Sequence, residues 1–255
     1  MTTGIDNPHA SVFPGSPSDD VAAIGACGSP AITALFVSMS QRHPDGADAR
    51  YLQWHTLDHR PEQQRLERIK TSLRVVSTQA CRDARLACAP RFQSVAHVMT
   101  YFFSALEGLD DFNALSTELR NAGRAPFILP PVERGVYATG EKLTAPHLKL
   151  GSDVLPWMPT RGIYLLIERG CASARALTEV EGVAGVWSGS SLATPFSSAG
   201  EGQTITYCFL DDDPLVTAQR LRAVLEARWK SGQVEPLFAG PFYSVVPYEW
   251  DRYLP

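Results

Sequence analysis

The sequence predicts an α+β protein made of two tandem copies of one βαββαβ unit, and three observations support this prediction. The same order of strand-like and helix-like segments occurs twice, over 31–144 and over 161–247. A stretch rich in proline, 145–160, separates the copies and is typical of a linker. Only the first copy contains a polar and aromatic cluster, at 51–61. We therefore expect a flexible N-terminal tail (1–30), a first repeat (31–144), a linker (145–160), and a second repeat with an aromatic C-terminal tail (161–255).

The segments of the first copy follow the βαββαβ order. Helical spacing over 48–56 predicts a helix, and Pro61 either ends it or opens the next turn. The charged stretch 62–70 is compatible with a short second helix. A further helix is predicted to begin at Asp110 and to stop at Gly123, where glycine is favoured after a helix. Apolar runs and alternating patterns predict strands at 31–40, 72–79, 94–105 and 134–143.

The second copy repeats this order with a stronger final helix. Residues 173–180 predict a short helix, and 215–230 predict a long one. Asp213 and Pro214 precede the long helix in the N-cap and N1 positions that these residue types prefer. Strands are predicted at 162–168, 182–191, 203–210 and 236–246.

Two such units imply two four-stranded antiparallel sheets, each with its helices on one face. The other face of each sheet is apolar and must be covered. We expect the sheets to face each other as a barrel that encloses a cavity, so that one chain acts as a pseudo-dimer and exists as a monomer or a homodimer. The residues available to line that cavity include Phe36, His97, Met99, Tyr101, Tyr164, Tyr207 and Phe209.

Composition excludes several classes of partner. The formal charge of −4 gives no basic excess, so we expect no nucleic acid. No apolar stretch approaches the ~20 residues that span a bilayer, and no signal peptide is evident, so we expect no membrane and a cytoplasmic protein. Five cysteines without metal or redox spacing predict buried free thiols. Four arginines lie among acidic residues and are interpreted as a solvated helix face: Arg60, Arg65, Arg68 and Arg74.

The first copy carries a short motif that resembles a known family. Trp54-His55, followed by His59-x-Pro61, is similar to the Trp-His-x-x-x-His-x-Pro stretch of EthD-like proteins in the dimeric α+β barrel superfamily. The resemblance implies two ferredoxin-like repeats, of which one is competent because the second lacks the motif. The superfamily includes monooxygenases, haem proteins, isomerases, cyclases and decarboxylases, so it implies no single chemistry.

The candidate catalytic residues are His55, Tyr51 and His59. His55 and His59 are four residues apart and share one face of a helix. An imidazole transfers protons near neutral pH, and Tyr51 lies one turn before His55, within reach of it or of a substrate oxygen. The alternatives are a metal site completed by Asp58 and a purely structural role. The candidate substrate-binding residues are Trp54, His97, Tyr101 and Phe36.

These residues predict a cofactor-independent acid–base enzyme of lyase, isomerase or cyclase type. Its partner is expected to be a small apolar carbonyl or phenolic compound, held in the barrel cavity. Two alternatives remain: an oxygen- or haem-dependent monooxygenase with His97, His55 or His147 as axial ligand, and a ligand-binding protein without chemistry. We expect no cofactor and no metal, with haem or a divalent metal as the alternative.

Overall fold

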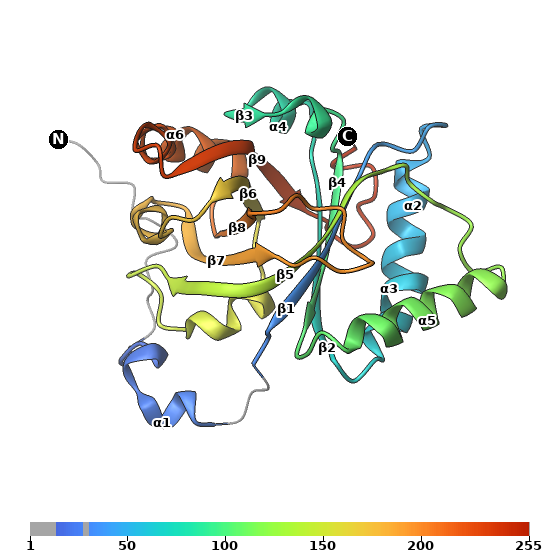
Figure 1. The fold of residues 1–255 in the computed structure, drawn as a ribbon, viewed down its shortest axis with the longest axis horizontal. Coiled ribbons are helices and arrows are strands. Elements are labelled where there is room, and N and C mark those ends of the chain that lie inside the picture. Colours follow the sequence, from blue (N-terminus) through green and yellow to red (C-terminus); the bar gives the residue numbers. More distant parts are fainter. Residues whose placement is uncertain (1–13, 28–30, 255) are drawn as a thin grey trace.

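The structure is a computed structural model and describes residues 14–27 and 31–254 (Figure 1). The first half has strands and helices in the predicted order. Its long strands are β1 (Ala34–Ser40), β2 (Ile69–Val76), β4 (His97–Phe103) and β5 (Pro131–Thr144). Its main helical segments are α2 (Asp48–Trp54), the π-helical turn η2 (His55–His59), α3 (Arg60–Gln64) and α5 (Gly108–Asn121). Three short elements between β2 and β4 were not predicted: α4 (Gln79–Asp83), β3 (Ala87–Cys88) and η3 (Pro90–Phe92).

The second half repeats the order with a different set of helices. Its strands are β6 (Gly162–Gly170), β7 (Val183–Ser191), β8 (Gln203–Leu210) and β9 (Val234–Ser244). The long helix α6 (Pro214–Lys230) starts where it was predicted, and the Asp213 side chain accepts hydrogen bonds from the amides of Leu215 and Val216. The predicted helix at 173–180 is instead a 3-10 turn, η5 (Arg175–Glu179), and another, η4 (Ser152–Trp157), lies in the linker.

The strands form one antiparallel sheet that closes into a ring. Their order is β2-β4-β1-β5-β7-β8-β6-β9-β3, and β2 also pairs with β9. Each repeat has the same internal order, β5-β1-β4-β2 in the first and β9-β6-β8-β7 in the second. Helices α2, α3 and α5 cover the outer face of the first sheet, and α6 covers the second (Figure 1). The predicted fold class, two ferredoxin-like repeats whose sheets form an α+β barrel, is confirmed.

The interior of the barrel is packed with side chains, so the prediction of a cavity there is wrong for the described residues. Phe102, Trp187, Tyr207 and Phe209 are at most 1% exposed and meet inside the barrel. The hydroxyls of Thr100 and Tyr207 are hydrogen-bonded across it at 2.6 Å. Because side chains alternate along each strand, every second residue points to the outer face of the sheet. A pocket lies there, between the first sheet and its helices. Phe36, Met99 and Tyr101 lie on that outer face, under the helices of the first repeat.

The helix of the first repeat does not end at Pro61. It passes through the π-helical turn His55–His59 into α3, with Pro61 in the first turn of α3. Proline has no amide hydrogen and its ring clashes with the preceding turn, so a regular α-helix cannot continue there. A wider turn accommodates the proline, and such turns are frequent at functional sites. Gly123 has a φ of +72° and ends α5 as predicted.

The described part of the N-terminal region contacts the segment between the repeats, and the C-terminal region contacts β9. The Ser18 amide donates to the Lys149 carbonyl at 2.8 Å, and the Asp19 carboxylate accepts from the Ser152 amide; residues 1–13 and 28–30 of the predicted tail lie outside the described residues. At the other end, Tyr253 stacks on Tyr243 with ring centroids 4.7 Å apart. All five cysteines are free, and Cys81 and Cys208 are buried. No helix in residues 14–27 and 31–254 has the length and apolarity needed to cross a membrane.

Candidate functional site

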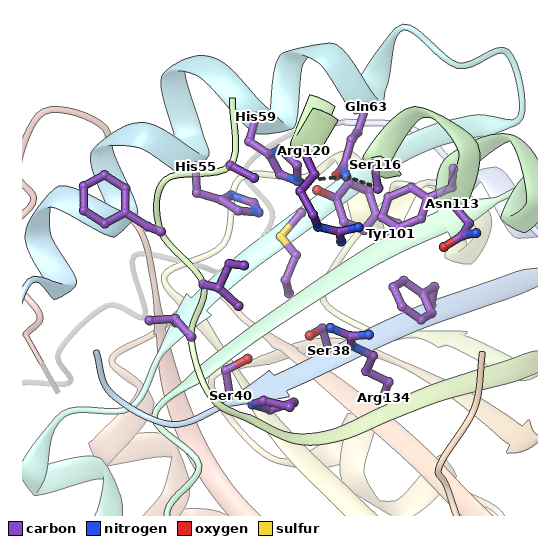
Figure 2. A pocket seen from close by; sticks show the side chains of 18 of the residues that line it. Ser38, Ser40, His55, His59, Gln63, Tyr101, Asn113, Ser116, Arg120 and Arg134 are labelled. Atoms are coloured by element: carbon purple, nitrogen blue, oxygen red, sulfur yellow. Dashed lines mark hydrogen bonds between the residues drawn. The ribbon is translucent and has the colours of Figure 1, made fainter. Parts of the chain in front are cut away.

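A pocket of about 320 Å³ lies between the outer face of the first sheet and the helices that cover it (Figure 2). Its floor is formed by β1 and β4, and its walls by the α2–η2–α3 helix and α5. The segment 125–131 closes one side, and Pro195 and Phe196 from the second repeat contribute to the rim. Six of the seven residues predicted for the site line it: Phe36, Tyr51, Trp54, His55, His59 and Tyr101.

His55 is the central imidazole of this pocket. It is 5% exposed, its ring lies 5.7 Å from that of Tyr51, and its Nδ1 has no hydrogen-bond partner among the described residues. Burial, and then the positive charge of Arg74, lower the pKa of His55 well below its ordinary value of 6.5. The ring is therefore neutral at pH 7 and able to accept a proton. Figure 2 shows it directed into the pocket.

His59 lies beside His55, with ring centroids 5.5 Å apart, and is connected through Gln63 to the opposite wall, α5. The Gln63 amide nitrogen donates to His59 Nε2 at 2.9 Å and to Ser116 Oγ of α5 at 3.1 Å. With Nε2 as the acceptor, His59 carries its proton on Nδ1. Its ring also stacks on Trp54 at 4.8 Å, and burial lowers its pKa. These contacts fix the orientation of His59.

Arg74 is a buried cation without a counterion. It comes from β2 and is 5% exposed, and its guanidinium lies 4.6 Å above the ring of Tyr51. Its Nε and Nη2 have no hydrogen-bond partner in the described part of the chain. The interpretation of Arg74 as part of a solvated face is wrong, because alternation in β2 places it opposite Leu73 and Val75, on the pocket side.

The other three arginines of that group differ from Arg74. Arg60 is half-buried and donates from Nε to Ser72 Oγ at 2.7 Å. Arg65 and Arg68 are exposed and pair with Glu62 and Asp111. The prediction of a solvated face therefore holds for these last two residues.

Tyr101 provides a hydroxyl donor on the floor of the pocket. It is 3% exposed, its hydroxyl has no partner among the described residues, and its ring packs 4.8 Å from Phe112. Burial raises the pKa of Tyr101, so the phenol stays protonated at neutral pH. A protonated, unpaired hydroxyl in an apolar wall is available to donate to a ligand oxygen.

His97 does not line the pocket, although it was predicted as a binding residue. It is fully buried at the start of β4, where its Nε2 lies 2.8 Å from Asp48 Oδ1 of α2. Burial lowers its pKa to about 4. His97 shares a face with Tyr101, but it lies beneath the start of α2 rather than beneath the open space.

The charge around the pocket is positive. Among the described residues, no Asp or Glu lines it, whereas Arg74, Arg120 and Arg134 do. Figure 2 shows Arg120 from α5 and Arg134 from β5 extending into the open space from opposite sides. The nearby carboxylates of Asp58 and Glu62 bind Arg124 instead, at 3.1 and 2.8 Å. Arg120 and Arg134 were missed by the sequence analysis, because neither belongs to a motif.

The described residues contain no group of three His, Cys, Asp or Glu side chains that would hold a metal ion. Asp58, the residue that would complete a His-x-x-Asp-His cluster, is bound to Arg124. Of the histidines considered as haem ligands, His97 is bound to Asp48, and His147 is bound to Asp211 at 2.8 Å outside the pocket. Neither residue lines the pocket, so neither would offer an axial ligand to a group bound in this space.

Comparison with known proteins identifies the fold but not a family. No family model matches the chain, and no curated protein matches it. A solved structure described as a candidate chlorite dismutase is 13% identical over 88% of this chain and 99% of its own, with a TM-score of 0.53. A candidate monooxygenase from Fusobacterium nucleatum is 9% identical over 85% of this chain and 94% of its own, with a TM-score of 0.51. These similarities place the chain in the α+β barrel fold over most of its length.

Proposed function

We propose that the protein is an enzyme that moves a proton on a small aromatic carbonyl or phenolic compound, with His55 as the proton acceptor. The observation that carries the proposal is a neutral, buried imidazole in the same pocket as two unpaired donors, Arg74 and Tyr101. A base next to preorganised oxyanion donors is the arrangement that lowers the barrier to removing a proton beside a carbonyl. Aromatic walls exclude water and suit a flat ring.

In the proposed reaction, His55 removes a proton from the carbon next to the carbonyl. The electrons of the C–H bond form a C=C bond, and the carbonyl π electrons move to the oxygen, giving an enolate and an imidazolium. The enolate oxygen is stabilised by the Tyr101 hydroxyl and the Arg74 guanidinium. When the substrate also carries a C=C bond between the β and γ carbons, the charge of the enolate extends to the γ carbon. The imidazolium then protonates the γ carbon and the C=C bond moves next to the carbonyl, so that the product is an isomer and His55 is restored. No other reactant is consumed.

Substrate binding would also adjust the basicity of His55. After burial, the positive charge of Arg74 is the largest cause of its lowered pKa, followed by the charges of His59 and Arg60. A negative oxygen next to Arg74 offsets that charge and raises the pKa of His55 towards its ordinary value. For a carbonyl substrate this negative charge develops only as the enolate forms, so it stabilises the imidazolium produced in that step; a bound phenolate would have the same effect from the start. In this scheme His59 is a positioning residue. Gln63, which also donates to Ser116, holds the His59 ring in place beside that of His55.

An oxygen-dependent monooxygenase is the second candidate, and it begins with the same deprotonation. The similar fold of the candidate monooxygenase from Fusobacterium nucleatum supports considering it. An electron-rich enolate or phenolate would reduce dioxygen, so turnover would consume one O₂ for each substrate. An oxygen electrode distinguishes the two candidates, because isomerisation consumes none.

Hydrogen–deuterium exchange tests the proposal. Wild-type protein should accelerate exchange at the acidic carbon of an aromatic ketone such as 2-tetralone in D₂O, followed by NMR. His55→Gln should lower the enzymatic rate by about 10²- to 10⁴-fold, the contribution of a general base. His147→Gln is the matched control, because His147 lies outside the pocket. Absence of exchange with wild type across a panel of ketones and phenols would instead indicate a ligand-binding protein.

A further inference from the structure

We infer that the compound bound in this pocket is an aromatic carboxylate and that Arg74 binds its carboxylate group. The inference rests on the proposed function of the same pocket and adds the chemical class of the compound. When the carboxylate of the compound occupies the N–H edge of Arg74, the Tyr101 hydroxyl is the donor that remains for the enolate oxygen. It starts from the burial of Arg74, whose side chain is 5% exposed and makes no hydrogen bond or ion pair with the described residues. A buried charge is costly unless it is paired and hydrogen-bonded. A guanidinium in this state matches the two oxygens of a planar carboxylate.

The protein itself offers Arg74 only a partial partner. The ring of Tyr51 lies 4.6 Å from the guanidinium carbon and stabilises its face. That contact leaves the N–H groups at the guanidinium edge, including Nε and Nη2, without acceptors. The carboxylate of Asp48 is bound to His97 and paired with Arg42 at 3.6 Å. No described side chain offers an acceptor to the edge of Arg74, and a ligand carboxylate in the pocket would supply one.

The walls of the pocket favour an aromatic body attached to that carboxylate. Rings surround the space on several sides, and Phe36 and Phe112 are in edge contact at 5.4 Å. A space of about 320 Å³ lies at the lower end of the range for small-molecule sites and admits a one- or two-ring compound. The aromatic lining comes from all sides of the pocket: Phe36, Trp54, Phe112, Phe127 and Phe196.

The rim of the pocket would attract such an anion. Arg120 and Arg134 are exposed and extend into the opening from α5 and β5 (Figure 2). Neither makes a side-chain ion pair in the described part of the chain, and no Asp or Glu lines the pocket. Same-sign charge around a cleft raises the local concentration of oppositely charged ligands. The charges and the rings together select an aromatic acid over a neutral ring or a cation.

Arg74 also borders a second hollow of about 330 Å³, together with Arg60 and the residues Thr160 and Ser244. That hollow has fewer aromatic walls and would suit a small inorganic anion. The guanidinium of Arg74 lies over the ring of Tyr51, which lines the first pocket and not the second, so the first pocket is favoured as the ligand site. Inorganic phosphate is therefore included in the test.

Calorimetric titration of the full chain tests the inference with two probes of nearly equal shape, 2-naphthoate and 2-naphthamide. Wild type should bind the acid about 10- to 100-fold more tightly than the amide, the effect of hydrogen bonds to a charged group. Arg74→Met should remove this preference by weakening the acid alone, and Arg74→Lys should keep part of it. Arg222→Met, an exposed arginine on α6, is the matched control and should bind both probes as wild type does.

Three results would overturn the inference. The first is equal affinity of wild type for the acid and the amide, which needs no variant and so does not depend on the folding of Arg74→Met. The second is a preference for the acid that persists in folded Arg74→Met. The third is Arg74-dependent binding of phosphate that does not compete with naphthoate, which would place the anion in the second hollow. Hydrogen–deuterium exchange on the same samples separates the claims: a missing exchange with an intact acid preference contradicts only the proposed function.

Discussion

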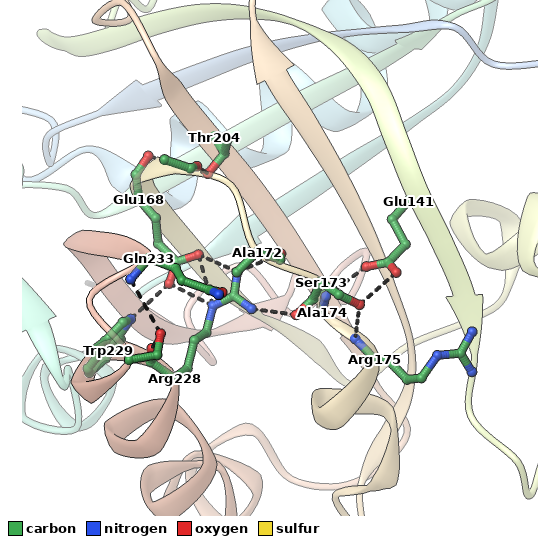
Figure 3. Close-up of polar contacts among 12 residues, drawn as sticks. Glu141, Glu168, Ala172, Ser173, Ala174, Arg175, Thr204, Arg228, Trp229 and Gln233 are labelled. Carbon is green, nitrogen blue, oxygen red and sulfur yellow. Dashed lines mark hydrogen bonds and ion pairs between the residues drawn. The ribbon is translucent and has the colours of Figure 1, made fainter.

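The two repeats share a strand order, but among the described residues the buried charge in the second repeat is paired and the one in the first is not. In the second repeat, Glu168 is 1% exposed and is fully partnered: Arg228 donates to it from Nε at 2.9 Å and from Nη2 at 2.8 Å, and Trp229 donates at 2.8 Å (Figure 3). Arg228 also donates to the carbonyls of Ala172 and Ser173. In the first repeat, the equally buried Arg74 has no such partners.

The packing of the outer faces differs in the same way. Over the second sheet, Leu221 and Leu225 of α6 are fully buried against Val186 and Leu210, and the layer is solid. Over the first sheet, the helix interrupted by the π turn and α5 leave a pocket lined by unpaired donors. A fully satisfied buried charge serves the fold, whereas an unsatisfied one next to open space points to a ligand.

The largest expected effect on stability comes from breaking the buried ion pair between Arg228 and Glu168. Arg228→Met should lower the free energy of unfolding by about 3–5 kcal/mol, because it leaves the buried Glu168 carboxylate without its cation. Urea denaturation measures this change, with Arg222→Met as the exposed control on the same helix. A loss below about 1 kcal/mol would mean that the network in Figure 3 does not hold the second repeat together.

A smaller effect concerns the pH dependence of stability, to which two buried histidines of the first repeat contribute. Burial lowers the folded-state pKa of His55 and brings that of His97 to about 4, so the unfolded chain binds these protons more tightly. Their contribution to stability is present above pH 6.5, the ordinary value, and is lost as the pH falls towards 4. His55→Gln should reduce the slope of unfolding free energy in this window by up to about 1.4 kcal/mol per pH unit. Denaturation curves between pH 4.5 and 7.5 measure the slope, and an unchanged slope would contradict the buried, neutral state of His55.

The sequence predicts most of the fold because its strongest signals are local. The strand predicted at 203–210 matches β8 residue for residue, and Asp213 and Pro214 mark the start of α6. These patterns depend on strand pleat and helix capping, which neighbouring residues determine. The candidate site residues were chosen from the same kind of local pattern, and six of the seven line one pocket.

The remaining parts depend on contacts between distant segments. Alternation shows that Phe36 and Phe209 lie on the faces of strands, but the closure of the ring decides that one meets the helices and the other fills the barrel. Nothing near Arg74 in the sequence indicates that its charge lacks a counterion, because Asp58 and Glu62 are close along the chain yet bind Arg124. Short-range patterns therefore find the imidazoles and miss the cation beside them.

The most direct test of a ligand-directed Arg74 is the stability of Arg74→Met, measured by urea denaturation with and without 2-naphthoate. Without ligand, the variant should be at least as stable as wild type to within about 1 kcal/mol, because no pairing is lost. With 2-naphthoate at 100 times the dissociation constant of wild type, the free energy of unfolding of wild type should rise by about 2.7 kcal/mol. At the same ligand concentration, that of the variant should rise much less. A loss of about 3 kcal/mol in the ligand-free variant, as predicted for Arg228→Met, would show that Arg74 is a structural residue and would contradict the account.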